Sequence, residues 1–228
     1  MIRSAIFAGI ILVATVSCER DGQDVMNYSW DFEESAEGWI GDFADYPVGE
    51  ADDYELTFAY DQLPQPLDTS MGALKLAGTN MSDDLFMFTM KKAEGLEPNT
   101  RYDVSFTVQF ASDIPDGLFG VGGSPGESVW IKAGAVNREP VPEEDNMGYY
   151  RMNIDKGGQS LGGDDMLVLG DFSNDTEQEV WTLKTVSSDE RFRVTTDMNG
   201  EVWIIVGTDS GFEATTTIYY NRIEVDFE

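Results

Sequence analysis

The 228-residue sequence contains no histidine, and this absence excludes several classes of functional site. A Ser-His-Asp triad, a Cys-His dyad and a histidine-ligated zinc or iron centre all require an imidazole ring. Any catalysis by this chain must therefore use carboxylates, Tyr, Lys or a bound metal ion.

Cysteine and positive charge are also scarce. Cys18 is the only cysteine, so the chain cannot form an internal disulfide. Lys and Arg together number 14 against 43 Asp and Glu, which gives a net charge of -29. Such a field repels nucleic acid, which binds to clustered cations. The acidity has two explanations: solubility through self-repulsion, or a supply of oxygen ligands for a hard cation such as Ca²⁺.

Long helical patterns are missing after residue 27, and alternating patterns take their place. In Arg101–Ala111 the residues Tyr102, Val104, Phe106, Val108 and Phe110 alternate with polar ones, which predicts a half-buried antiparallel strand. About a dozen such strands predict an all-β antiparallel sandwich (a jelly roll) as a single domain over residues 28–228. The expected strands are Tyr28–Phe32, Trp39–Phe43, Tyr54–Tyr60, Ala73–Ala77, Leu85–Lys91, Arg101–Ala111, Ser128–Ala135, Tyr149–Ile154, Met166–Leu169, Val180–Thr185, Phe192–Thr196, Val202–Gly207 and Thr217–Phe227.

Two further expectations follow from the strand pattern. Leu85–Met90 and Val202–Val206 are apolar on both faces, so we expect them to be central strands covered on both sides. The Asn-Gly pair in Asp197–Gly200 predicts a hairpin between Phe192–Thr196 and Val202–Gly207.

The N-terminus has the layout of an export signal. Residues 1–17 carry one charge, Arg3, and an apolar run of a length typical of a signal peptide and too short to span a bilayer. The cysteine that follows, Cys18, resembles the lipobox cysteine of bacterial lipoproteins, and the resemblance implies removal of residues 1–17, acylation of Cys18 and an acidic tether over 18–27. The chain is then anchored at the outer membrane or cell surface. The alternative is ordinary secretion with an unpaired thiol.

Three segments resemble galactose-binding-like jelly rolls, the superfamily of many carbohydrate-binding modules. They are Asp31-Phe32-Glu33 with Gly38-Trp39, then Gly95–Tyr102, and finally Ile218–Val225. The chain is also similar to a set of uncharacterised secreted bacterial lipoproteins. The superfamily resemblance implies a structural Ca²⁺ between the first and last strands, with Asp31, Glu33 and Asp226 as its ligands, although Asn221 stands where the family often has Asp.

The scarce cations gather near aromatic residues on two expected strands. By alternation Trp130 and Lys132 share one face, as do Tyr149, Arg151 and Asn153, and Lys156 follows closely. An aromatic ring beside polar donors suits a sugar, whose C–H face stacks while its hydroxyls form hydrogen bonds. The alternative is packing, in which Lys and Arg stems lie over aromatic rings. We assign Trp39, Trp181 and Trp203 to packing.

The C-terminal sequence Glu224-Val225-Asp226-Phe227-Glu228 resembles the E-x-D-x-E strand of laminarinase-like glycoside hydrolases. The resemblance implies that Glu224 and Glu228 act as nucleophile and acid/base, with Asp226 between them. Its position in the last five residues, where chains fray, speaks against this role.

Two other motifs have simpler interpretations. Gly122–Gly126 matches the G-x-S-x-G of esterases, but an expected strand follows it and no histidine base exists, so we read it as a flexible loop. Asp171–Glu177 has alternating oxygen side chains but lacks the glycine and helices of an EF-hand, so we read it as an acidic turn.

Taken together, the sequence predicts a surface lipoprotein with a non-catalytic glycan-binding β-sandwich. A small glycoside hydrolase and an adhesive or structural protein without a small ligand are the alternatives. The polar face of Arg101–Gln109 offers a discriminating test, because we expect it to line a cleft with Trp130 and Arg151 if the glycan-binding hypothesis holds.

Overall fold

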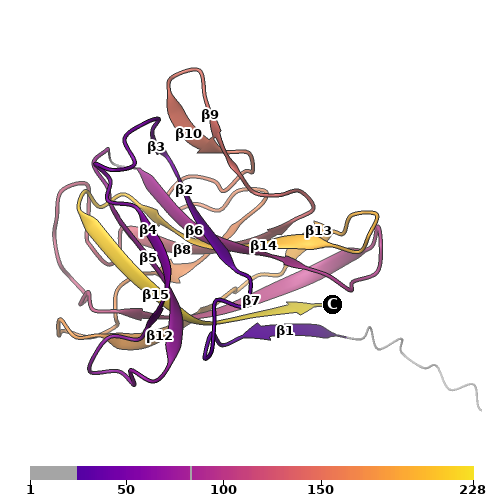
Figure 1. Cartoon of the computed structure of the whole chain (residues 1–228), viewed down its shortest axis with the longest axis horizontal. Coiled ribbons are helices and arrows are strands. Elements are labelled where there is room, and N and C mark those ends of the chain that lie inside the picture. Colours follow the sequence, from indigo (N-terminus) through magenta and orange to yellow (C-terminus); the bar gives the residue numbers. More distant parts are fainter. Residues whose placement is uncertain (1–24, 83) are drawn as a thin grey trace, which may run out of the picture.

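The chain folds into two antiparallel sheets packed face to face, with a small third sheet beside them (Figure 1). The structure, a computed structural model, describes residues 25–82 and 84–228. The strands are β1 (Met26–Trp30), β2 (Ile40–Ala44), β3 (Tyr46–Pro47), β4 (Thr57–Gln62), β5 (Gly72–Thr79), β6 (Leu85–Ala93), β7 (Arg101–Ser112), β8 (Val129–Val136), β9 (Pro142–Glu144), β10 (Tyr149–Met152), β11 (Leu167–Asp171), β12 (Thr182–Ser187), β13 (Phe192–Thr195), β14 (Val202–Ser210) and β15 (Thr215–Phe227). Among the described residues, no helix is long and apolar enough to cross a membrane.

The larger sheet has seven strands in the order β12-β7-β15-β5-β4, with β1 beside β15 and β13 beside β7. Its two longest strands, β7 and β15, run side by side. The apolar face of β7 is buried as its alternation predicts: none of its five apolar side chains is more than 6% exposed. Its polar face lies on the outside of the sheet, where Gln109 donates to Thr185 and Thr107 bonds to Ser187.

The second sheet has five strands in the order β11-β8-β14-β6-β2. The two strands predicted to be central, β6 and β14, pair with each other and have neighbours on their other edges. One face of this sheet packs against the seven-stranded sheet. The other is covered by chain after β8, where Ile154 and Met166 pack on Phe86, Phe88 and Ile205. This second covering explains why β6 and β14 are apolar on both faces.

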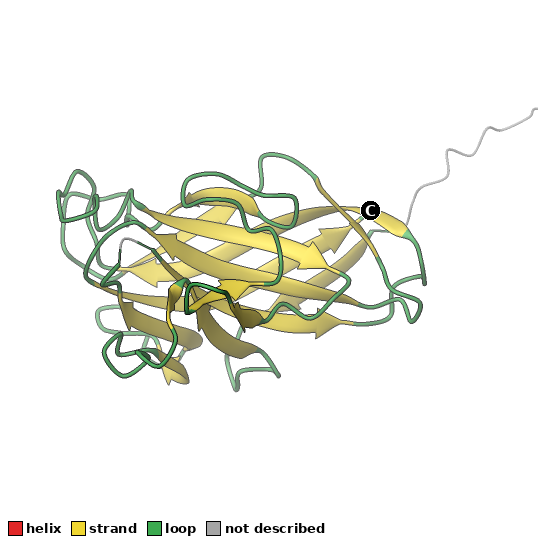
Figure 2. Ribbon diagram, turned by 90° about the horizontal axis from the view of Figure 1, so that it is seen from above, coloured by secondary structure: helices red, strands yellow, loops and turns green. Residues whose placement is uncertain are grey.

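The main hydrophobic core lies between the two sheets, and Figure 2 shows the strands running along the long axis with loops at both ends. Phe106 and Phe110 from β7 and Tyr220 from β15 are at most 1% exposed there. Burial of each such ring contributes about 1.5–3 kcal/mol, and truncating one to Ala costs about 3–5 kcal/mol. Two sheets held by one continuous core confirm the all-β sandwich.

All thirteen expected strands are present, with ends shifted by a few residues. The sequence patterns missed β3 and β9, which have two and three residues and each contain a proline. Such short edge segments are too brief to show alternation. They pair with β10 as a three-stranded sheet of order β3-β10-β9, which projects from the sandwich.

The hairpin predicted at Asp197–Gly200 is wrong. The turn itself is tight, because Asp197 accepts hydrogen bonds from the amides of Asn199 and Glu201 and Gly200 has a positive φ of 75°. However, β13 pairs with β7 in the larger sheet, whereas β14 belongs to the other sheet. The turn is therefore a corner that carries the chain from one sheet to the other.

The N-terminal predictions lie mostly outside the described residues. The signal peptide (residues 1–17), Cys18 and residues 19–24 of the expected tether are among those not described. The last two tether residues, Met26 and Asn27, belong to β1 and pair with Phe227 and Asp226. The sandwich thus begins at residue 26, two residues before the expected boundary.

Candidate functional site

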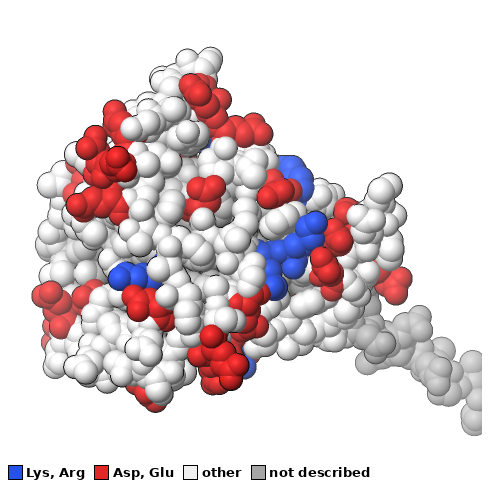
Figure 3. Space-filling view, in the orientation of Figure 1, with Lys and Arg blue, Asp and Glu red and all other residues white. Residues whose placement is uncertain are grey.

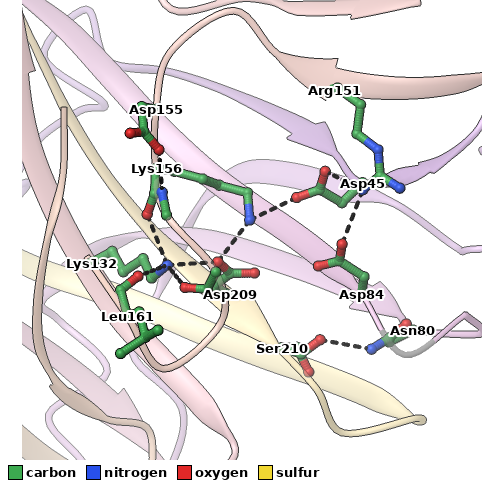
Figure 4. A network of polar contacts seen from close by, with 12 residues as sticks. Asp45, Asn80, Asp84, Lys132, Arg151, Asp155, Lys156, Leu161, Asp209 and Ser210 are labelled. Atoms are coloured by element: carbon green, nitrogen blue, oxygen red, sulfur yellow. Dashed lines mark hydrogen bonds and ion pairs between the residues drawn. The ribbon is translucent and has the colours of Figure 1, made fainter. Parts of the chain in front are cut away.

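The predicted cations Lys132, Lys156 and Arg151 converge on three aspartates above the outer face of the five-stranded sheet (Figure 4). Lys132 projects from β8 and Asp209 from β14, and both side chains are 0% exposed. The Nζ of Lys132 lies 2.8 Å from Oδ2 of Asp209. It also donates to the carbonyl oxygens of Lys156, Gly158 and Leu161. Lys132 therefore holds the loop after β10 onto the sheet, and its full burial corrects its prediction as a ligand-binding residue.

Lys156 and Arg151 extend this ionic network toward the surface. Lys156 Nζ lies 2.7 Å from Asp209 and 2.9 Å from Asp45, and Arg151 Nη1 lies 2.6 Å from Asp45 and 3.0 Å from Asp84. Burial lowers the pKa of Lys156, but Asp209 and Asp45 outweigh it, so the net shift is upward. Three acids and three bases balance one another, as buried charges require.

The network opens into a polar cavity of about 610 Å³ whose lining includes Asp45, Asp84, Arg151 and Lys156. Burial, with the nearby charge of Asp45, raises the pKa of Asp84 to about 6. One oxygen of Asp84 and one of Asp209 are buried without a hydrogen-bond partner. Asp84 is thus the carboxyl of this network whose charge is least well compensated.

The other residues predicted for a sugar-binding face do not complete a platform here. Arg151 lies over the ring of Tyr149, 5.0 Å from its centroid. Asn153 has a structural role, because it donates to the carbonyl of Glu139 and accepts from the amide of Val141. Trp130 shares a face with Lys132 as predicted, but it is not among the residues that line the cavity.

The carboxylates predicted for Ca²⁺ do not converge. Asp226 pairs in register with Asn27 and accepts its side-chain hydrogen bond at 2.8 Å, whereas Asp31 lies beyond the far end of β1. Asp31 and Glu33 instead line a separate surface cavity of about 370 Å³. Asn221 is buried and donates to the carbonyl of Gly72. These residues therefore do not fit a shared ion.

Among the described residues, Asp45, Asp84 and Asp209 form the one group of three carboxylates close enough to share a metal. However, the Lys156 ammonium already bonds to Asp45 and Asp209. The chain supplies its own cation at this position, so this group does not fit a calcium site either.

The C-terminal carboxylates lie on the outer face of the seven-stranded sheet. Glu224 pairs with Arg222 at 2.7 Å, and Glu228 pairs with Arg191. The main cavities over the described residues are lined by other side chains. A pair of glutamates facing across a substrate cleft, as the hydrolase resemblance implies, is therefore not formed.

A cleft of about 460 Å³ lies elsewhere, over the outer face of β4, β5 and β15. Its aromatic lining is Phe172, which is 1% exposed, together with Trp181 and Tyr219, whose ring centroids are 5.2 Å apart with planes at 89°. Polar groups surround these rings; they are Thr57, Lys75, Asp113, Thr215, Thr216 and Thr217. The cleft therefore combines aromatic surface with hydroxyl, ammonium and carboxylate groups.

The position of Trp181 is determined by the loop between β11 and β12. Asn174, 2% exposed, donates to the carbonyls of Gln178 and Val180, and its own amide donates to the carbonyl of Ile114. Lys184 ties the same loop through ion pairs of 2.8 Å to Asp171 and Asp175. The predicted acidic turn at Asp171–Glu177 is thus a support for Trp181.

The charged groups of the cleft carry perturbed pKa values. Burial lowers the pKa of Lys75, but contacts with Tyr219 and Asp61 outweigh it and the net shift is upward. Lys75 Nζ lies 5.4 Å from the Tyr219 ring centroid. Burial raises the pKa of Asp113, with a further contribution from Glu179. Lys75 therefore carries a positive charge at neutral pH. Its ammonium group can donate hydrogen bonds to a neutral ligand in the cleft, and the carboxyl group of Asp113 can accept them.

The sequence did not identify this cleft. Trp181 was assigned to packing, and it does pack against an apolar cluster that includes Leu63 and Tyr219. It is also partly exposed and lines the cleft, which the sequence did not predict. The polar face of β7, expected beside Trp130 and Arg151, lies on the outside of the opposite sheet. A tryptophan that follows the polar segment Glu177–Val180 was the one available signal, and it does not distinguish a cleft from a core.

The chain was compared with known protein families, curated proteins and solved structures. No family model and no curated protein matches the chain. Similar solved structures include the family 11 carbohydrate-binding module of a Clostridium thermocellum cellulase, at 10% identity, covering 89% of this chain and 95% of that one with a TM-score of 0.42. TmCBM27, a carbohydrate-binding module that recognises mannan, is 12% identical over 90% of this chain and 99% of its own, with a TM-score of 0.40.

A third similar structure is the K1 cleaved adhesin domain of Lys-gingipain from Porphyromonas gingivalis. It is 11% identical over 89% of this chain and 98% of its own, with a TM-score of 0.37. Carbohydrate-binding modules are among the solved structures that this chain is similar to.

Proposed function

We propose that this chain is a non-catalytic glycan-binding domain and that its ligand binds in the cleft lined by Trp181 and Tyr219. The observation that carries the proposal is the pair of aromatic rings, Trp181 and Tyr219, in a cleft whose lining also includes Thr, Lys and Asp side chains beside apolar ones. Sugar rings present apolar C–H faces that pack on an aromatic ring, while their hydroxyls need directional donors and acceptors. The threonine hydroxyls can both donate and accept, Lys75 donates and Asp113 accepts.

A neutral sugar chain suits the electrostatics of the molecule. The net charge is -29, and acidic residues are spread over the face shown in Figure 3. An anionic ligand is repelled by the negative charge of the protein, whereas an uncharged ligand is not. A neutral polysaccharide is therefore the ligand class that we propose.

The test is a binding panel of the mature domain against laminarin, galactomannan and xylan, by affinity gel electrophoresis. We expect at least one to retard the wild-type domain, and Trp181→Ala to abolish the retardation. Trp130→Ala is the matched control, since it removes a partly buried tryptophan from the opposite sheet. Loss of binding in Trp130→Ala alone would move the site to the outer face of β8, and no binding by the wild type would favour a structural or adhesive protein.

We further propose that the domain is anchored to the outer membrane or cell surface through a lipid on Cys18. The geometry suits display, because β1 starts at Met26 opposite Phe227, while the cleft residues Thr215–Tyr219 lie at the other end of β15. Some ten residues of extended strand separate Thr217 from Phe227, about 30 Å. The cleft thus faces away from the end at which the anchor joins. Cys18→Ser is expected to move the full-length chain from the detergent phase to the aqueous phase in Triton X-114 partition.

A further inference from the structure

The loop between β7 and β8 exposes an unusual set of apolar side chains. Leu118, Phe119 and Val121 are 42%, 98% and 66% exposed. An isolated exposed apolar residue is ordinary, but three within four positions, one of them a fully exposed ring, indicate a surface that contacts something.

The backbone of this loop is held in place. The Asp116 amide donates to the carbonyl of Thr176 at 3.0 Å, and the Gly117 amide donates to Oε1 of Glu127 at 2.7 Å. At the tip, the Glu213 amide donates to the carbonyl of Val121 at 2.9 Å. The loop therefore presents its apolar side chains from a supported backbone.

Gly120 adds to this support. It lies so close to the ring of Phe212 that a Cβ there would be 2.3 Å from a ring carbon. The tip is thus packed on Phe212 through its backbone, and the neighbouring Phe119 side chain stays outside. A larger residue at position 120 would push the tip away from this contact.

The loop rises from the rim of the glycan cleft. Asp113 and Ile114, where the loop begins, and Pro125, near its end, all line the cleft. The segment that supports the tip, Phe212–Glu213, leads directly into Thr215 and Thr216 of the same lining. The loop that carries the exposed side chains therefore begins and ends at residues that line the cleft.

The surroundings of the loop decide which partner it fits. Asp116, Glu127 and Glu213 all lie at its base or beside its tip. With the overall charge of -29 they disfavour an anionic lipid surface or a second copy of the chain. A neutral sugar chain carries no charge to repel and offers further C–H faces to an aromatic ring.

We propose that Phe119 supplies a second aromatic contact for a glycan already held in the cleft, so that the ligand is an extended chain of several sugar units. The inference rests on the proposed function. The cleft at Trp181 takes the first units, and the chain then continues over the rim of the cleft onto the β7–β8 loop. Short saccharides reach the cleft alone, whereas longer ones gain the contact with Phe119.

The experiment compares a disaccharide and a hexasaccharide of laminarin, galactomannan and xylan by isothermal titration calorimetry. For the polysaccharide that binds, Phe119→Ala is expected to weaken hexasaccharide binding about five- to tenfold, in the range of one lost ring contact, and to leave disaccharide binding unchanged. Met198→Ala is the control, because Met198 is 76% exposed on the turn before β14, whereas Thr215–Thr217 of the cleft follow the opposite end of that strand. It should change neither affinity.

Other outcomes separate the inference from the proposed function. If Trp181→Ala abolishes binding while Phe119→Ala changes neither affinity, or both equally, the inference is overturned and the proposed function stands. If the wild type binds none of the probes, both are overturned. Phe119-dependent sedimentation with vesicles of phosphatidylcholine and phosphatidylglycerol, without an effect on hexasaccharide binding, would show a lipid contact instead.

Discussion

The indole ring of Trp181 stands edge-on to the ring of Tyr219, with 5.2 Å between the centroids. Tyr219 is 8% exposed, so its main role is to hold Trp181 at the mouth of the cleft. We expect Tyr219→Phe, which keeps the ring, to bind glycan within about twofold of the wild type, and Tyr219→Ala to bind at least about tenfold more weakly.

Calorimetry at a temperature where each variant is folded by circular dichroism tests this prediction. Tyr219→Ala also removes buried volume, at a cost to stability of about 2–4 kcal/mol. Equal loss of affinity in both variants would instead assign the effect to the Tyr219 hydroxyl.

The buried ion pair of Lys132 and Asp209 should be costly to break from one side. Both side chains are 0% exposed, and Lys132 also holds three carbonyl groups of the covering loop. Lys132→Met is expected to lower the free energy of unfolding by about 3–5 kcal/mol, because Asp209 loses a partner that water cannot replace. Urea denaturation measures the change.

A double variant and a surface control sharpen this test. Lys132→Met with Asp209→Leu removes both charges and should recover at least about half of the loss. Lys92→Met breaks the exposed pair with Glu201, whose side chains are 38% and 26% exposed, and should cost less than about 1 kcal/mol. A Lys132 effect as small as that of Lys92 would show that the network contributes little to stability.

Asp84 should make stability depend on pH. Its pKa is raised from 3.8 to about 6 by burial and by Asp45, so between these values the folded state binds more protons than the unfolded state. Stability therefore falls as the pH rises from about 4 to about 6, and it levels off above that range. The Asp84→Asn variant has no ionisable group at this position, so its stability does not fall with pH from this cause.

The measured quantity is the difference in unfolding free energy between Asp84→Asn and the wild type. It should shift in favour of the variant by about 1–2 kcal/mol between pH 4 and pH 7, a size discounted because the Asp84 side chain is 33% exposed. A difference that is constant with pH, or that shifts toward the wild type, contradicts the raised pKa.

Local pattern was sufficient to predict the strands and the fold class. The alternation in β7 and the apolar runs of β6 and β14 arise because each strand face that packs on apolar residues carries apolar side chains. This pattern can be recognised from a few consecutive residues. Which strands pair with one another was harder to predict from the sequence. The Asn-Gly turn at Gly200 satisfies the local signal for a hairpin, but the turn lies at a corner between the sheets, which only the packing of both sheets determines.

The two cavities show why side-chain placement was only partly predictable. Alternation correctly put Lys132 and Trp130 on one face of β8, but it could not show that a loop 24 to 29 residues further along the chain covers Lys132. The cleft at Trp181 joins Lys75, Asp113, Trp181 and Tyr219, which are far apart in sequence and lie on different strands and loops. The pairing and packing of the strands bring these residues together, so no short sequence motif identifies the site.

The C-terminal carboxylates should be dispensable for any action on glycans. Glu224 lies in β15 and Glu228 directly follows the last residue of this strand. Four extended residues separate their backbones by about 13 Å, whereas retaining hydrolysis needs carboxyl groups about 5–5.5 Å apart. Each is also tied to a neighbour, Glu224 to Arg222 and Glu228 to Arg191. We expect the wild type to release no reducing sugar from laminarin and Glu224→Gln to bind the panel polysaccharides as the wild type does. Hydrolysis by the wild type that Glu224→Gln abolishes would instead identify the chain as a glycoside hydrolase.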